Sequence, residues 1–129
     1  MFNSLDRTYQ PFLPRLLAVL DQPEASLAVV RAAFGDPACQ DAARMGAIAH
    51  WAVYYGDTDL ALEALRHGYV DLRGPTMLEI WHPIFAGLRK EARFKDIVRG
   101  VGLANHWRKS GKWGDFVRPL GADDFEIIR

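Results

Sequence analysis

The sequence of 129 residues contains a single cysteine, Cys39, and therefore cannot form an intramolecular disulfide. A chain that folds without disulfides suits a reducing compartment, and we expect it to be cytoplasmic. Long hydrophobic runs are also missing, because the most apolar stretches, 16–20 and 47–55, fall far short of the roughly 20 residues that cross a bilayer. Residues 1–10 contain no apolar core of a signal peptide. We therefore expect no export signal, no transmembrane helix and no membrane partner.

An excess of charge of one sign is absent, since 16 basic side chains balance 16 acidic ones. This balance gives no overall attraction to nucleic acid or membrane surfaces. The histidines do not form a metal-binding pattern, because none of them lies four residues from another or next to a cysteine: His50, His67, His82 and His106. The glycine-rich and serine-centred motifs of nucleotide-binding and hydrolytic enzymes are also missing. The sequence thus predicts a protein without catalytic residues, metal or cofactor. An enzyme whose site only the tertiary fold assembles remains a third hypothesis.

Proline and glycine divide the sequence into segments of helical length. In the first helix pair, residues 1–35, Pro11 opens one helix and Asp21 caps the next, which begins at Pro23 and ends at Gly35. Each helix has apolar residues at three- and four-residue spacing, which places them on one face. These residues are Leu13, Leu16, Leu17 and Leu20 in the first helix, and Leu27, Val30 and Phe34 in the second.

The second helix pair, residues 36–70, repeats this pattern. Asp36 is expected to cap a long helix over 38–55. Gly56 ends that helix, and Asp57 caps a fourth helix that closes near Gly68. Cys39 falls in the first turn of the long helix, where the helix dipole favours a thiolate. We prefer a small buried residue, because the sequence offers no base or second cysteine beside it.

The remaining residues predict capping helices over 76–116 and an irregular, extended tail over 117–129. Short helices are expected at 76–81, 83–88, 91–101 and 103–110. No segment shows the alternating pattern of a strand. The sequence therefore predicts an all-α single domain, 1–129, with about six or seven helices in antiparallel pairs.

The two helix-joining turns, at Asp21 and Asp57, lie 36 residues apart, a spacing typical of helix-pair repeats. The second pair has Ala49 in its first helix, Gly56 and Asp57 at its turn, and Ala61 and Leu65 in its second helix. This arrangement resembles a tetratricopeptide repeat, with glycine at position 68 where that pattern usually has alanine. The resemblance implies a scaffold that binds a protein or peptide.

A second resemblance covers residues 81–116. Its residues are Trp81, Pro83, Phe85, Leu88, Arg89, Arg93, Phe94, Gly102, Leu103, Trp107, Arg108, Gly111, Asp115 and Phe116. This string is similar to the C-terminal end of bacterial tetratricopeptide-type signalling and regulatory proteins. The resemblance implies an end-cap of a helical stack, which Trp107, Trp113 and Phe116 would cover with apolar surface. It implies no catalytic activity.

Two surfaces are candidates for binding. Trp51 and Tyr54 fall off the apolar stripe of the third helix, so they predict an exposed partner-binding face, with Arg44 and Tyr55 beside them. The partner would be a protein, a peptide or a second copy of the chain.

The alternative is a basic segment, 89–113, with eight basic and two acidic residues and a net charge of +6. It could bind an anion or nucleic acid, or pair internally with acidic residues elsewhere, and we prefer internal pairing. Its basic residues are Arg89, Lys90, Arg93, Lys95, Arg99, Arg108, Lys109 and Lys112.

Overall fold

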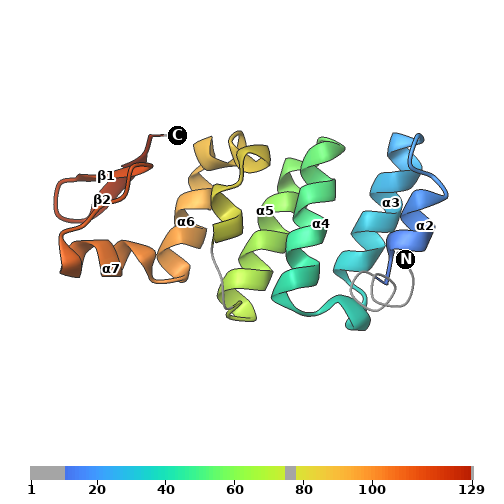
Figure 1. Cartoon of the computed structure of the whole chain (residues 1–129), viewed down its shortest axis with the longest axis horizontal. Coiled ribbons are helices and arrows are strands. Elements are labelled where there is room, and N and C mark those ends of the chain that lie inside the picture. Colours follow the sequence, from blue (N-terminus) through green and yellow to red (C-terminus); the bar gives the residue numbers. More distant parts are fainter. Residues whose placement is uncertain (1–10, 75–77, 129) are drawn as a thin grey trace.

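The structure, a computed structural model, describes residues 11–74 and 78–128. These residues form six α-helices and a two-stranded sheet: α2 (Leu13–Leu17), α3 (Pro23–Phe34), α4 (Ala42–Tyr54), α5 (Thr58–Arg66), α6 (Ala92–Gly100), α7 (Leu103–Ser110), β1 (Val117–Leu120) and β2 (Asp124–Ile127). Figure 1 shows α2 to α6 standing side by side in a row, with α7 lying across one end and the sheet at that same end, above α7 in this view. The expected all-α class therefore holds for most of the chain, and the C-terminal sheet is an addition to it.

The centre of the row is formed by α4 and α5, which pack against each other more extensively than any other two helices. Their facing sides bury small residues, which allow a close approach, and larger aliphatic residues between them: Met45, Ile48, Ala49, Ala52, Ala61, Leu62 and Leu65. Gly56 adopts the left-handed conformation, with φ at +83°, and turns the chain between them. The side chain of Asp57 then accepts a hydrogen bond from the amide of Leu60, which confirms Asp57 as the cap of α5.

The first helix is shorter than the sequence predicts. Because the chain turns after Leu17, α2 has only five residues, and Leu17 and Leu20 are exposed by 56% and 40%. The buried hydroxyl of Ser26 donates to the carbonyl oxygen of Val19 and holds this early turn. The prediction that Leu20 shares one apolar helix face with Leu13, Leu16 and Leu17 was therefore wrong, because α2 ends before Leu20. Asp21 is not the cap of α3, since Gln22 occupies that position.

The predicted long helix over 38–55 is divided. Asp36 caps only a short 3₁₀ turn, Pro37–Cys39, and α4 begins at Ala42, where Asp41 accepts a hydrogen bond from the amide of Arg44. Cys39 is completely buried in the 3₁₀ turn, and burial raises the pKa of its thiol. The structure supports the small buried residue and contradicts the thiolate.

Between α5 and α6 the chain forms short turns in place of regular helices. The end of α5 continues past the expected stop at Gly68 as a π-helical turn, His67–Asp71. Three 3₁₀ turns follow, Leu78–Trp81, Pro83–Phe85 and Leu88–Lys90. The predicted helix at 76–81 lies partly outside the described residues, whereas the predicted helices at 91–101 and 103–110 are confirmed as α6 and α7.

The predicted irregular tail was wrong, because β1 and β2 form an antiparallel hairpin in which Arg118 lies opposite Glu126. Only Val117 in β1 and Phe125 in β2 are buried. Pro119 interrupts the alternation in β1, and β2 alternates polar and apolar residues over four positions only. The hairpin covers the end of the row beside α7, as Figure 1 shows. None of the helices in the described part of the chain is long and apolar enough to cross a membrane.

Candidate functional site

Three aromatic residues gather at the carboxyl end of α4. The ring of Tyr54 meets that of Tyr55 edge to face, with centroids 4.9 Å apart and planes at 87°. Trp51 stacks on Tyr55 at 6.2 Å and meets the edge of Tyr54 at 6.0 Å. Trp51 and Tyr55 are half-buried against the core, whereas Tyr54 is 69% exposed. The structure thus brings together three of the four residues predicted to bind a partner.

A shallow pocket of about 600 Å³ opens beside these rings. One wall is the end of α4 and the other is the turn between α2 and α3, and the lining residues are Leu20, Asp21, Pro23, Val53, Tyr54, Tyr55 and Gly56. The hydroxyl of Tyr55 donates to the carbonyl oxygen of Leu20 at 2.7 Å and joins the two walls. This hydrogen bond places exposed Leu20 and exposed Tyr54 on one surface.

The sequence did not identify the second wall of this pocket. The sequence placed Leu20 on the apolar face of the first helix and Asp21 at a cap, because both assignments follow from local helix patterns. The signal that points to them is Leu20 itself, a large apolar residue directly before the polar Asp21–Gln22 turn. Such a residue lies at a helix end, where it is exposed unless another element covers it.

The charged groups around the pocket are acidic. Asp21 lines it, and Glu24 lines an adjoining hollow of about 550 Å³ that shares Pro23 with it. Neither carboxylate forms an ion pair or hydrogen bond with residues 11–74 or 78–128. The neighbouring cation Arg31 is already paired with Asp57, at 2.8 Å. Burial acts to raise the pKa of Asp57, but the hydrogen bonds from the Leu60 amide and from Arg31 outweigh burial. The pKa of Asp57 is therefore lowered, and the carboxylate is ionised at neutral pH.

Arg44 does not belong to this site. It lies in the first turn of α4, ten residues before Tyr54, which corresponds to about 15 Å along a helix. There it forms an ion pair with Asp41, next to the start of its own helix.

The residues of the basic segment do not gather on one surface. Arg89 is buried and donates hydrogen bonds to the carbonyl oxygens of Ile80 and His82, at 3.1 and 3.0 Å. Burial lowers the pKa of its guanidinium. Arg93 reaches back to α5, where it pairs with Asp59 at 2.5 Å. Two of the eight cations are thus engaged with the middle of the chain.

Three further cations hold the hairpin. Lys95 and Arg99 each lie 2.8 Å from the same oxygen, Oδ1 of Asp124. The guanidinium of Arg108 donates to the carbonyl oxygen of Asp124 at 2.6 Å. Internal pairing thus occupies five of the eight basic residues, and in the described ranges the remaining three, Lys90, Lys109 and Lys112, are exposed and form no ion pair.

The residues predicted to cap the stack form one aromatic cluster. Trp81 stacks on Phe116, with centroids 5.4 Å apart, and lies 6.4 Å from Trp107. Trp107 contacts Trp113 at 5.6 Å, and both rings contact Phe125, which is completely buried. The cluster therefore joins the 3₁₀ turn Leu78–Trp81, α7 and the hairpin.

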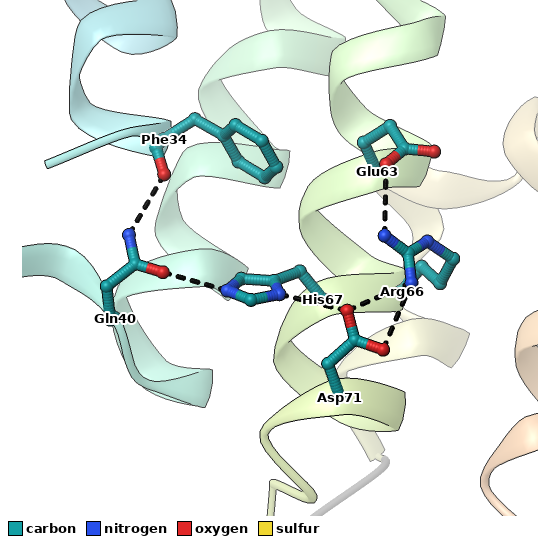
Figure 2. Close-up of polar contacts among 6 residues, drawn as sticks. All are labelled: Phe34, Gln40, Glu63, Arg66, His67 and Asp71. Carbon is teal, nitrogen blue, oxygen red and sulfur yellow. Dashed lines mark hydrogen bonds and ion pairs between the residues drawn. The ribbon is translucent and has the colours of Figure 1, made fainter. Parts of the chain in front are cut away.

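A polar network links the end of α3 to the π-helical turn (Figure 2). The amide nitrogen of Gln40 donates to the carbonyl oxygens of Phe34 and Asp36, so its oxygen is left to face Nε2 of His67, at 2.8 Å. Nδ1 of His67 lies 3.0 Å from Asp71. A neutral imidazole has one N–H and satisfies one of these two oxygens, whereas a protonated ring satisfies both.

Asp71 is the acidic centre of this network. The hydrogen bond from His67 is the largest influence that lowers the pKa of Asp71, and Arg66 adds to it through an ion pair at 2.9 Å. Arg66 also bonds to Glu63, at 3.2 Å (Figure 2). Every titratable group here has a structural partner, and among the described residues no three His, Cys, Asp or Glu side chains are placed to hold a metal ion.

Comparisons with protein-family models, with curated proteins and with solved structures gave no match to this chain. The candidate site therefore rests on the geometry of the pocket alone.

Proposed function

We propose that the chain is a non-catalytic interaction module of tetratricopeptide type, which binds a protein or peptide at the pocket beside Tyr54. One support is the α4–α5 pair, where buried Ala49 and Ala61 allow two helices joined by the Gly56–Asp57 turn to approach closely. At Gly68, where the tetratricopeptide pattern usually has alanine, a Cβ atom would lie only 2.8 Å from Cβ of Met45. The departure from that pattern therefore has a packing reason in this chain.

The observation that carries the proposal is the exposure of Tyr54 and Leu20 on the two walls of one pocket. Aromatic residues are frequent among the few side chains that provide most of the free energy of protein binding. They are costly to expose without such a role when they are grouped with other apolar residues. Because Tyr55 fixes the two walls by its hydrogen bond to Leu20, the pocket is formed before a partner binds.

The test is a selection of peptides from a random library on the unaltered chain, followed by affinity measurements with variants. Tyr54→Ala should weaken the selected peptides by about tenfold or more, as expected for a central aromatic contact. Leu120→Ala is the matched control, since Leu120 is also exposed but lies in the hairpin at the other end of the molecule. Both variants should keep the circular dichroism of the unaltered chain.

Two outcomes would contradict the proposal. Equal losses in Tyr54→Ala and Leu120→Ala would mean that binding is not centred on the pocket, and a selection that yields no peptide would remove the function. Light scattering during size-exclusion chromatography tests whether the chain binds a second copy of itself. A dimer that Tyr54→Ala converts into a folded monomer would identify a second copy of the chain as the partner.

A further inference from the structure

We propose that the pocket recognises a basic side chain, lysine or arginine, presented by a segment of the partner protein. This inference rests on the proposed function and names the chemistry of the partner. It combines the carboxylates of Asp21 and Glu24, which form no ion pair within the described part of the chain, with the aromatic rings of Tyr54 and Tyr55.

The charge around the pocket is one-sided. Among the described residues that line the pocket and the adjoining hollow, the charged side chains are Asp21 and Glu24, and both are exposed. Arg31, the cation that α3 supplies, is held by Asp57 through two hydrogen bonds of 2.8 and 3.0 Å. An arriving cation therefore meets two carboxylates that have no counter-ion to displace among residues 11–74 and 78–128.

The two helix ends at the pocket carry partial charges of opposite sign. The carboxyl end of α4 carries the partial negative charge of its last carbonyl groups into the pocket wall formed by residues 53–56. The amino end of α3, at Pro23, carries the opposite partial charge, but Glu24 lies in its first turn and offsets it. The charged side chains of this surface, Asp21 and Glu24, therefore favour a cation.

The aromatic rings supply the second part of the recognition. Tyr54 and Tyr55 line the same pocket with planes at nearly a right angle, so a side chain in the corner between them meets two π-systems. Ammonium and guanidinium groups are attracted to such rings, and their aliphatic stems pack on apolar surface such as Leu20 and Val53. An acidic or phosphorylated segment would instead face Asp21 and Glu24, which would repel it.

The test uses synthetic peptides that differ at one position. A peptide obtained with the unaltered chain is made with arginine, lysine, norleucine or glutamate at the position whose replacement weakens binding most, and each version is titrated at 50 mM and 500 mM NaCl. Norleucine keeps the aliphatic stem of lysine and removes the charge. We expect the arginine and lysine versions to bind at least about fivefold more tightly than norleucine, as a cation on aromatic rings beside a carboxylate would.

The variant Asp21→Asn separates charge from shape. It should weaken the arginine version about two- to fivefold at 50 mM NaCl, with a smaller effect at 500 mM NaCl, and leave the norleucine version unchanged. Asp123→Asn is the control, because Asp123 is an exposed carboxylate in the turn of the hairpin, at the other end of the molecule. It should leave all four versions unchanged.

Norleucine or glutamate binding as tightly as arginine would overturn this inference. If Tyr54→Ala still abolished that binding, the pocket would keep its function as an apolar interaction site. If none of the four peptide versions bound, and Tyr54→Ala affected the binding of no selected peptide, the proposed interaction function of the pocket would be refuted as well. A third outcome is that the arginine version does not bind, but the chain associates with itself and Tyr54→Ala abolishes this association. The partner would then be a second copy of the chain and not a basic segment.

Discussion

The ammonium group of Lys95, on α6, lies 2.8 Å from Oδ1 of Asp124, the first residue of β2. The same oxygen accepts from Arg99 and from the amide of Phe125, both at 2.8 Å. Lys95 and Arg99 also lie over the ring of Phe125, at 5.2 and 5.1 Å from its centroid. One carboxylate thus gathers two cations and fixes the buried aromatic residue of the hairpin against α6.

Replacing Asp124 by asparagine should loosen the hairpin while the helices remain folded. The neutral amide keeps the size of the carboxylate but loses its attraction to Lys95 and Arg99. We expect a lower melting temperature and faster amide hydrogen exchange in β1 and β2 than in α4 and α5. The control is Asp123→Asn, a change at an exposed residue of the adjacent hairpin turn. If amide hydrogen exchange in β1 and β2 were equally slow in both variants, Asp124 would not be what holds the hairpin.

Gly68→Ala should destabilise the fold, although alanine is the better helix former by about 1 kcal/mol. The added Cβ would lie 2.8 Å from Cβ of Met45, and overpacking of this kind typically costs about 1–3 kcal/mol. Gly87→Ala is the matched control, since Gly87 has φ at −66° and a methyl group added there would have no atom within 4 Å. Urea unfolding should show a loss for Gly68→Ala and no loss for Gly87→Ala.

Acid should destabilise the chain mainly below about pH 4, where aspartate in unfolded chains begins to bind protons. In the folded chain the pKa values of Asp57, Asp71 and Asp124 are all lowered. The unfolded chain therefore takes up protons first, and the stability given by these carboxylates is lost as the pH falls through their folded pKa values. Urea midpoints measured from pH 7 to pH 3 test this. A variant with asparagine in place of Asp57, Asp71 and Asp124 is the control. If it lost as much stability between pH 7 and pH 3 as the unaltered chain, other groups would cause the acid effect.

Gln40→Ala should weaken the link between the end of α3 and the π-helical turn. The side chain of Gln40 forms hydrogen bonds to two carbonyl oxygens and to His67, and their combined loss should cost about 1–3 kcal/mol. Gln22→Ala removes a side chain of the same type that forms no capping bond and should leave the stability within about 0.5 kcal/mol. Thermal unfolding of both variants gives the comparison, and equal melting temperatures would refute a structural role for the network.

The sequence predicted those elements whose signals are local. The left-handed Gly56 and the cap at Asp57 each act within one turn of the chain, so the end of α4 and the start of α5 followed from their residues. α7 was predicted with its bounds, because its apolar spacing and following glycine need no partner to be read. The hairpin was missed, since Pro119 and the exposed Leu120 remove the alternation that marks a strand.

The candidate site divides in the same way. The position off the apolar stripe of the helix predicted that both Trp51 and Tyr54 are exposed. The structure confirms this for Tyr54, whereas the prediction was wrong for Trp51, which is half-buried against the core. Leu20 and Asp21 could not be assigned to the same site, because they reach it through the hydrogen bond from Tyr55 to a residue 35 positions earlier. The distribution of the basic segment also depends on distant partners, Asp59 on α5 and Asp124 in the hairpin.

The sequence by itself determined the helical character of the chain, the α4–α5 turn and the aromatic end of α4, because capping, glycine conformation and helical periodicity act over a few residues. Only the tertiary structure decided that α2 ends early, that the tail forms a hairpin and that Tyr55 joins the end of α4 to the turn at Leu20. Those features depend on packing and pairing between segments far apart in the chain, and no local pattern specifies which distant segments will meet.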